Sequence, residues 1–413
     1  MNKRFEASQA LYQRALKVIP GGVYGHQRPE FLVPGHYPAF ISSAKGCRIE
    51  DPDGNRYIDF MCSYGPMVVG YANPAVEEAV DKQRGLCDSG NLPAPNLVEL
   101  AEKLVSITEG MDWAMFAKNG SDVCSWSVAL ARQASGRPLV AMVAGTYHGV
   151  HAWCNNAHAG FLEGERAATM SFQWNDLSSL EALFEDHPDQ IAAVIVTPLK
   201  HENHGESVMP GPGFIAGLRK LCSRHGSVMI VDDVRAGFRL HMGGSTQCWG
   251  VSPDLLLYSK AMANGYAVSA ILGTEALREA ARRVFVTGTF FTQAVPIAAA
   301  LATIEQLQSN DGIKHMFTLG ERFSSGLLAR AEKAGYRATV SGPPALPLMT
   351  FDEDRGSFQL SRRFGAAWAA RGVFVNPVHN WFISTAHSEA DIDEALFLAE
   401  GAFEELRKGP PLT

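Results

Sequence analysis

Residues 227–238 read SVMIVDDVRAGF, an apolar run that ends abruptly in two carboxylates. Such a run is typical of a strand buried on both faces, as strands of parallel sheets are. Side chains alternate faces along a strand, so we expect Asp232 and Asp233 to point in opposite directions and to have different roles. A carboxylate at the end of a buried strand costs free energy unless cations or hydrogen-bond donors compensate it. The stretch therefore predicts a buried sheet and a cationic partner for Asp232.

Similar apolar runs recur through the middle of the chain and alternate with stretches of helical periodicity. The runs lie at 139–143, 192–196, 254–259 and 267–273, and the helical stretches include 123–134 and 213–225. This alternation predicts an α/β fold with a mostly parallel sheet that helices cover on both faces.

The two ends of the chain show other patterns. Residues 5–19 have the spacing of an amphipathic helix, and residues 47–60 are typical of a hairpin around Asp53-Gly54. Two long helical stretches, 296–309 and 314–334, precede a Pro/Gly-rich turn and a final strand–helix region. We predict an N-terminal segment (1–46) that contributes to a small domain, a large domain (47–300), and a small α+β C-terminal domain (301–413).

Composition narrows the classes of function. The 413 residues are 46% hydrophobic and 19% charged, with a formal net charge of -7 and no long basic run, which argues against nucleic acid or anionic membrane as partners. Seven cysteines without a CxxC pair indicate a reduced, cytoplasmic protein without a disulfide framework. The first residues lack the apolar core of a signal peptide, and no run is long and apolar enough to cross a bilayer. The histidine pairs 148/151 and 201/204 lack a third ligand at suitable spacing, so we expect no metal site.

The ends of the predicted strands carry the candidate chemistry, because ligands of open parallel sheets bind at the carboxyl ends of the strands. Tyr147 follows the first run, Asp232 ends the third, and Lys260 ends the fourth. Taken alone, each residue is better explained without a ligand: Tyr147 as a core aromatic, Asp232 as a helix cap or turn former, and Lys260 as a solvated lysine. Their combination at one sheet edge is what indicates a site.

A fourth element is an anion site at the start of a predicted helix. Asn119, Gly120 and Ser121 precede the helical stretch 123–134, so free backbone N–H groups and a hydroxyl meet there. Taken alone, this stretch is better explained by an ordinary helix cap, and it is neither a Walker loop nor a GxGxxG fingerprint.

Pyridoxal 5'-phosphate (PLP) is a ligand that uses all four parts. Its phosphate suits the helix N-terminus, its ring suits an aromatic face, and its aldehyde suits a lysine that forms a Schiff base. Its ring nitrogen withdraws electrons only while protonated, which requires a carboxylate beside it. We therefore expect Asp232 to pair with this ring nitrogen and Asp233 to fix local structure.

The chain resembles the class III PLP-dependent aminotransferases of the aspartate aminotransferase-like fold, and within them glutamate-1-semialdehyde aminomutase most. The resemblance spans about residues 18–405. It rests on the motifs IPGGV (19–23), DPDGNRYIDF (51–60), SYGPMVVGYANP (63–74), NGSDV (119–123), GTYHG (145–149), VDDVRAGFR (231–239), SPDLLLYSK (252–260), GTF (288–290) and FISTAHSEADIDE (382–394).

The resemblance implies a role for each matching residue. Lys260 is the Schiff-base lysine and general acid/base, and Asp232 is the partner of the ring nitrogen. The residues that would hold the rest of the cofactor are Gly120 and Ser121 at the phosphate, Tyr147 and Val234 on the two ring faces, and Thr289, which reaches the cofactor of a neighbouring subunit. It thus implies a homodimer with shared active sites. Arg28 matches an arginine that receives a substrate carboxylate, and a solvated surface arginine explains it equally well.

The substrate side departs from the aminomutase pattern. Its substrate-side tryptophan aligns with Tyr64, its serine before the arginine with Gly25, and the usual glutamate after a central strand with Thr197. We therefore expect an aminotransferase that moves an amino group from an amino acid or other amino carboxylate, β-amino acids included, to a keto or aldehyde acceptor. An aminomutase-like isomerase and an amino-acid epimerase remain open, because both need the same lysine and aspartate.

Overall fold

The structure, a computed structural model, describes residues 3–155, 157, 159–201 and 205–408. Its contacts divide the chain into two compact units. The first is drawn from Met1–Asn73, Asn203–Ser207 and Lys314–Thr413, and the second from Pro74–Glu202 and Val208–Ile313. Residues 47–73 thus group with the two ends of the chain and 301–313 with the larger unit, whereas we had predicted boundaries at 47 and 301.

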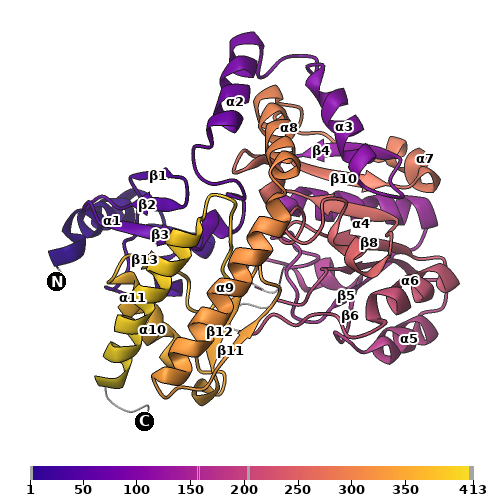
Figure 1. The fold of residues 1–413 in the computed structure, drawn as a ribbon. Helices are drawn as coiled ribbons and strands as arrows, with labels where there is room; N and C mark the ends of the chain where they lie inside the picture. The colour runs from indigo at the N-terminus through magenta and orange to yellow at the C-terminus, as the bar shows by residue number, and fades with distance from the viewer. Residues whose placement is uncertain (1–2, 156, 158, 202–204, 409–413) are drawn as a thin grey trace. The chain divides into compact units, whose positions relative to one another are not determined.

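The second unit contains a seven-stranded sheet (Figure 1). Its order is β4 (Trp113–Ala117), β10 (Ser269–Gly273), β9 (Leu255–Tyr258), β8 (Val228–Asp232), β7 (Ile191–Val196), β5 (Leu139–Val143) and β6 (Thr169–Phe172). The pairs from β6 to β9 are parallel, and β10 runs antiparallel to both of its neighbours. The expected α/β fold and its mostly parallel sheet are confirmed. The two strands that the sequence did not predict, β4 and β6, lie at the sheet edges, where partial exposure breaks up an apolar run.

Side chains that alternate between the two faces of the sheet form the core of this unit. One face buries Val228 and Ile230 of β8 against Val123 and Val128 of α4 (Gly120–Ser135), together with residues of the neighbouring strands. The intervening residues, such as Met229 and Val231, are equally buried, so both faces are covered. The remaining helices of the unit are α2 (Pro74–Leu86), α3 (Asn96–Ile107), α5 (Leu177–Asp186), α6 (Phe214–His225), α7 (Arg278–Arg283) and α8 (Ala294–Ser309), with short 3₁₀ helices η5 (Glu163–Arg166), η6 (Ser245–Trp249), η7 (Lys260–Ala263) and η8 (Glu275–Leu277).

The first unit joins segments that lie far apart in the sequence. Its sheet has the order β1 (Ser43–Lys45), β2 (Arg48–Glu50), β3 (Arg56–Asp59) and β13 (Val373–Phe374), and β13 runs parallel to β3. A second hairpin pairs β11 (Ala338–Ser341) with β12 (Leu348–Phe351). The helices are α1 (Glu6–Val18), α9 (Gly312–Lys333), α10 (Gln359–Ala369) and α11 (Glu389–Lys408), with 3₁₀ helices η1 (Lys3–Phe5), η2 (Gly25–Gln27), η3 (Pro29–Phe31), η4 (Cys62–Tyr64) and η9 (Asp352–Asp354).

Two aspartates of the β2–β3 hairpin explain why residues 47–60 belong to this unit. Asp51 accepts hydrogen bonds from the Asp53 and Asn55 N–H groups and from the Tyr57 hydroxyl, which fixes the turn. The Asp53 carboxylate accepts from the first N–H groups of α1, at 2.7 and 2.9 Å. The hairpin therefore caps the N-terminal helix while β3 pairs with β13 near the C-terminus.

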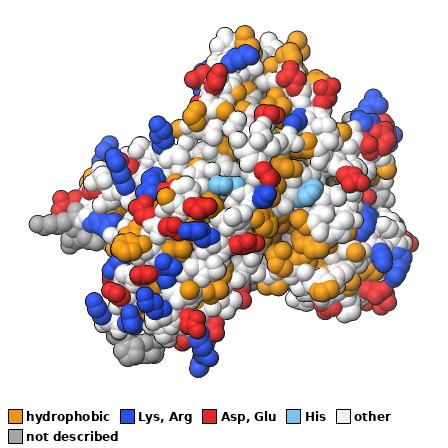
Figure 2. Space-filling model, in the orientation of Figure 1, with side chains coloured by type: hydrophobic (Ala, Val, Ile, Leu, Met, Phe, Trp, Pro, Cys, Tyr) orange, Lys and Arg blue, Asp and Glu red, His pale blue; other side chains and the backbone are white. Residues whose placement is uncertain are grey.

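Surface charge and helix hydropathy are the two features that concern nucleic acid and membranes as partners. On the face seen in Figure 2, basic and acidic side chains are interspersed. None of the helices within the described residues is long and apolar enough to span a membrane.

Candidate active site

The two carboxylates at the end of β8 point to opposite faces of the sheet, as predicted. Asp232 continues the side of β8 that packs on α4, and the Cys124 thiol of that helix lies 3.4 Å from Asp232 Oδ2. Asp233 lies on the other side and accepts hydrogen bonds from the Ser245 N–H and hydroxyl, at 2.8 and 2.6 Å. The adjacent aspartates therefore have separate surroundings.

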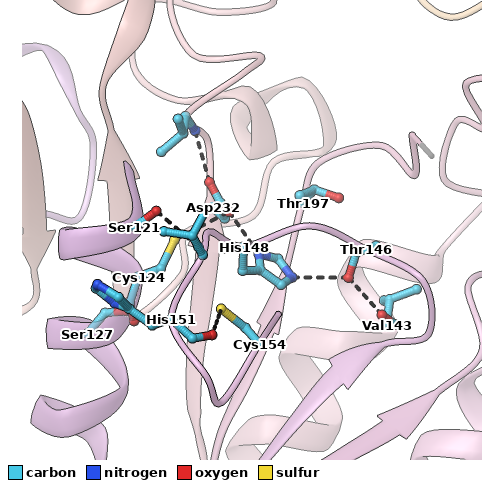
Figure 3. A network of polar contacts seen from close by, with 12 residues as sticks. Ser121, Cys124, Ser127, Val143, Thr146, His148, His151, Cys154, Thr197 and Asp232 are labelled. Carbon is cyan, nitrogen blue, oxygen red and sulfur yellow. Dashed lines mark hydrogen bonds and ion pairs between the residues drawn. The ribbon is translucent and has the colours of Figure 1, made fainter. Parts of the chain in front are cut away.

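Asp232 is the centre of a buried hydrogen-bond network (Figure 3). His148 Nδ1 lies 2.8 Å from Asp232 Oδ2, and its Nε2 lies 3.2 Å from Thr146 Oγ1. Thr146 donates its hydroxyl proton to Val143 O, so its oxygen is left to accept from His148 Nε2. His148 therefore links Asp232 to Thr146 through its two ring nitrogens.

These contacts keep Asp232 ionised although it is buried. Burial by itself raises the pKa of Asp232, but the hydrogen bond and charge of His148 oppose it, as do the Val234 N–H and the Cys124 thiol. Together they hold the pKa of Asp232 below its ordinary value. One oxygen therefore remains a permanent anion that can stabilise a cation placed beside it.

The same residues have the donor types of a metal site. Ligand atoms of Cys124, His148 and Asp232 lie within 4.8 Å of one another, a buried group of the kind that can hold an ion. Each of these atoms already takes part in the network around Asp232, so hydrogen bonding accounts for the cluster. Of the other histidines considered as ligands, His204 lies outside the described residues.

Lys260 stands at the end of the neighbouring strand, β9. It begins η7 with a left-handed backbone (φ 43°), a conformation that is costly for a side chain with a Cβ. Burial first, and then the charges of Arg235 and Arg239, lower the pKa of Lys260 to about 7, while Asp232 acts in the opposite direction. Within the described residues its ammonium makes no hydrogen bond or ion pair. The amine is therefore available to a ligand and is partly neutral near pH 7.

The N-terminus of α4 offers donors for an anion. The Gly120 and Ser121 N–H groups have no partner within the described chain, as is usual for the first turn of a helix. Ser121 Oγ accepts from the Val150 N–H at 3.2 Å, which leaves the hydroxyl hydrogen free to donate. A Cβ at Gly120 would lie 3.0 Å from Val234 Cγ1, so the missing side chain keeps this corner open.

The donor set fits PLP part by part. Two backbone N–H groups and a hydroxyl suit the phosphate, the ionised Asp232 suits a protonated ring nitrogen, and Lys260 suits the aldehyde. The two residues expected on the ring faces also belong to this unit. Val234 lies two residues after Asp232, in the turn after β8, and Tyr147, 41% exposed, lies in the loop after β5.

Gly149 sets how closely the loop after β5 approaches α4. Its φ is +122°, and a Cβ there would lie 2.6 Å from Ser121 Oγ and 2.8 Å from Ser121 Cα. We expect Gly149→Ala to push the loop away from the phosphate donors and to weaken PLP binding by roughly 10-fold or more. Titration of the cofactor-free protein with PLP measures this.

Gly136→Ala is the matched control for that variant. Gly136 is also left-handed (φ +69°), at the other end of α4, but a Cβ there meets no atom within 4 Å. Equal losses of PLP affinity in both variants would attribute the effect to general strain rather than to the loop contact.

The raised pKa of Asp233 makes the stability of the fold depend on pH. Burial raises the pKa of Asp233 from 3.8 to about 7, against the two hydrogen bonds from Ser245. A carboxyl with a raised folded-state pKa stabilises the fold below the unfolded pKa, and this contribution is lost as pH rises through the folded pKa. As pH rises from 4 to 7, we expect the free energy of unfolding of wild type to fall by up to about 4 kcal/mol relative to that of Asp233→Asn. Urea unfolding of both proteins across this range measures it, and parallel pH dependences would contradict it.

Thr289 lies apart from the other predicted cofactor residues. It is exposed in the turn before α8, and no hydrogen bond joins it to Gly120, Ser121 or Lys260 within the described chain. Its neighbours Phe285 and Phe290 are 81% and 55% exposed.

The two predicted substrate residues belong to the first unit. The Tyr64 hydroxyl donates to His26 O at 2.7 Å, so Tyr64 reaches the loop that carries Arg28. Arg28 is exposed, and its guanidinium makes no hydrogen bond or ion pair within the described residues. His379 packs edge-on against the Tyr64 ring, with centroids 5.2 Å apart.

The backbone that presents Tyr64 is strained in a way the sequence did not reveal. Cys62, Ser63 and Tyr64 are consecutive left-handed residues, with φ of 45°, 57° and 63°. The buried Asp59 carboxylate accepts from the Met61 and Cys62 N–H groups and holds this turn. Such strain persists only where surrounding contacts fix the conformation.

Sequence reasoning missed four other residues of these sites. Cys124, Arg235 and Asp59 carried no assigned role, and His148 was considered only as a metal ligand. The GTYHG motif was the one available signal for His148, because it places the histidine next to Tyr147 after a strand.

Comparisons with known proteins agree with a site that binds PLP. The Aminotransferase class-III family model matches residues 33–396. The chain is 40% identical to an aminopentol aminotransferase of Sphingopyxis macrogoltabida (95% of this chain, 93% of the relative) and 34% identical to a 3-aminobutyryl-CoA aminotransferase of Cloacimonas acidaminovorans (97% of each). It is 33% identical to a glutamate-1-semialdehyde 2,1-aminomutase of Chloroflexus aurantiacus (98% of each). Among solved structures, the PLP form of the FumI protein of Sphingopyxis sp. MTA144 superposes with a TM-score of 0.95 at 39% identity (97% of this chain, 96% of that one).

Proposed function

Because the chain belongs to the class III aminotransferases and is a PLP-dependent enzyme that transfers amino groups, we propose that its donor is a β-amino carboxylate or a close derivative. The observation that carries the catalytic part is the convergence of Asp232 and Lys260 on neighbouring strand ends. One relative supports the position of the amine: it is named for 3-aminobutyryl-CoA, whose amine lies two carbons from the thioester carbonyl. A second relative is named for aminopentol, which supports transfer from an amino compound.

Each residue of the proposed site has one task. The Gly120 and Ser121 N–H groups and the Ser121 hydroxyl hold the phosphate, and Tyr147 and Val234 cover the two ring faces. Asp232 keeps the ring nitrogen protonated because its own negative charge is fixed by His148. When bound, PLP supplies an electron-withdrawing ring that accepts the electron pair left when a substrate C–H bond breaks.

Lys260 moves the proton. In its neutral form its amine takes the proton from the carbon that carries the substrate nitrogen, and as an ammonium it returns that proton on the cofactor side. The pKa of about 7 places both forms within reach at neutral pH. Lysine with its ordinary pKa would be almost wholly protonated there.

Arg28 is proposed to receive the donor's carboxylate. Its exposed guanidinium presents a planar set of donors that matches a carboxylate, and Tyr64 lies beside the same loop. A donor without a carboxylate would gain nothing from this residue.

Single-turnover spectroscopy with isomeric donors tests the function. The PLP absorption of the purified enzyme is followed while 3-aminobutanoate, 2-aminobutanoate or 2-butylamine is added without an acceptor. We expect 3-aminobutanoate to bleach the band fastest and a keto acid to restore it. Arg28→Met should raise the KM for 3-aminobutanoate by roughly 10-fold or more and leave that for 2-butylamine unchanged.

Other outcomes would assign other functions. Faster bleaching by 2-aminobutanoate would refute the β-amino proposal and leave the aminotransferase assignment intact. Conversion of one amino compound into its positional isomer without an acceptor would indicate an aminomutase, the activity named for the relative at 33% identity. Loss of optical activity without bleaching would indicate an epimerase.

We also propose that the enzyme is a homodimer. The turn that carries Thr289 exposes Phe285 and Phe290, and apolar side chains of this size usually become buried when a partner binds. A second copy would cover them and bring Thr289 to the neighbouring cofactor. Sedimentation of wild type and Phe285→Ser tests this, and a monomeric wild type at micromolar concentration would refute it.

A further inference from the structure

Arg235 has no role in the site described so far, although it leaves the same sheet edge as Lys260. Asp232 pairs with Leu257 in the parallel ladder of β8 and β9, and the Asp233 N–H donates to Leu257 O at 3.1 Å. Arg235 lies three residues beyond Asp232, and Lys260 lies three residues beyond Leu257. The two cationic residues therefore follow the ends of adjacent strands, Arg235 in the turn after β8 and Lys260 at the start of η7 after β9.

The turn that carries Arg235 is tightly held. The Val234 N–H donates to Asp232 Oδ1 at 3.2 Å, and the Gly237 N–H donates to Asp233 O at 2.8 Å. A Cβ at Gly237 would lie 2.6 Å from Asp233 O, so only glycine lets the chain close this turn without displacement. The position of Arg235 relative to β8 is consequently fixed by the backbone.

Charged and titratable groups from several elements face this pair. Burial lowers the pKa of Arg235 to about 10, while Asp232 and Tyr147 act to raise it. The positive charges of Arg235 and Arg239 disfavour the ammonium form of Lys260, and the negative charge of Asp232 favours it.

The negative charge of Asp232 favours the protonated forms of both cations, but its carboxylate has other partners as well. Its carboxylate is already shared with His148 from the loop after β5 and with Cys124 from α4. The positive charge of Arg235 acts against the ammonium form of Lys260. Two like charges on neighbouring, half-buried side chains disfavour the protonated amine, and the guanidinium cannot release its proton in this pH range.

We propose that Arg235 is a positioning residue whose fixed positive charge holds Lys260 in its neutral, proton-accepting form. The amine can then take the substrate proton as the C–H bond breaks, with the electron pair left on the substrate carbon, and it becomes an ammonium until it returns the proton. The use of this neutral amine in turnover rests on the proposed function, whereas the coupling between the two side chains does not.

The coupling is measured on the full-length protein after removal of PLP. Acetylation of Lys260 by acetic anhydride, an uncharged reagent, is followed against pH by peptide mass spectrometry. We expect a wild-type midpoint near pH 7, a midpoint about one to two units higher in Arg235→Met, and a near-wild-type midpoint in Arg235→Lys. An unchanged midpoint in Arg235→Met would overturn the proposal, as would a wild-type midpoint near 10.

Two further variants test whether a shift of the Lys260 midpoint is specific to Arg235 and whether it depends on how Arg235→Met folds. Arg224→Met removes an exposed arginine from α6 of the same unit and should leave the midpoint unchanged. If Arg235→Met does not fold, Arg235→Gln removes the same charge with a polar side chain. A shift in Arg224→Met as large as that in Arg235→Met would overturn the proposal by showing that any lost charge suffices.

The holoenzyme supplies the second measurement. The pH at which kcat rises should move upward in Arg235→Met and return in Arg235→Lys, with little change in KM. A shift of the Lys260 midpoint in a protein that transfers no amino group would refute the proposed function alone. Turnover with unshifted midpoints would refute the role of Arg235 alone.

Discussion

Lys260→Ala is expected to lower turnover by at least about 10³-fold, the upper part of the range lost when a general acid–base is removed. The variant removes both the amine that binds the cofactor and the group that moves the substrate proton. Lys260 is suited to these tasks by its place at the end of β9, its partly neutral amine and the absence of a hydrogen bond or ion pair to its ammonium within the described residues.

The measurement separates loss of chemistry from loss of fold. Steady-state rates with the best donor are compared with the PLP absorption and thermal midpoint of the same sample. Added ethylamine should restore part of the rate in Lys260→Ala, because a small free amine can accept the proton that Lys260 normally takes. Lys220→Ala, an exposed lysine on α6, is the matched control. A Lys260→Ala rate within 10-fold of wild type would rule out the assigned role.

Asp232→Asn should lower kcat by roughly 10²–10³-fold, the scale of a lost electrostatic contact to the reacting system. The amide keeps the size of the side chain and removes the charge that holds the ring nitrogen protonated. It also leaves the donors of His148 facing a neutral group. Single-turnover bleaching of the PLP band by the donor isolates this effect from product release.

The neighbouring carboxylate is the control for this variant. Asp233→Asn alters a side chain one residue away on the opposite face, where its partner is Ser245. We expect it to keep a rate within a few-fold of wild type while changing only the pH dependence of stability. Equal rate losses in the two variants would mean that neither carboxylate has a specific role toward the cofactor.

The fold could be predicted well where burial is continuous along the sequence. The five central strands of the large sheet follow from their apolar runs, because a strand covered on both faces leaves few polar positions. The edge strands β4 and β6 have partly exposed residues and no such signal. The place of residues 47–60 in the first unit was also beyond the sequence, because it depends on the pairing of β3 with β13 and on the capping of α1 by Asp53.

The sequence by itself determined which side chains stand at the strand ends and that Asp232 and Asp233 face opposite ways, since alternation along a strand is a local property. The tertiary structure alone decided what surrounds them. His148 reaches Asp232 across 84 residues because β5 and β8 lie on either side of β7, and Arg235 and Lys260 follow neighbouring strand ends because β8 and β9 are adjacent. The order of the strands in the sheet cannot be predicted from any single segment of the sequence. The ionisation of Asp232 and the neutral form of Lys260 depend on burial and on charges from separate elements, so their chemistry exists only once the chain has folded.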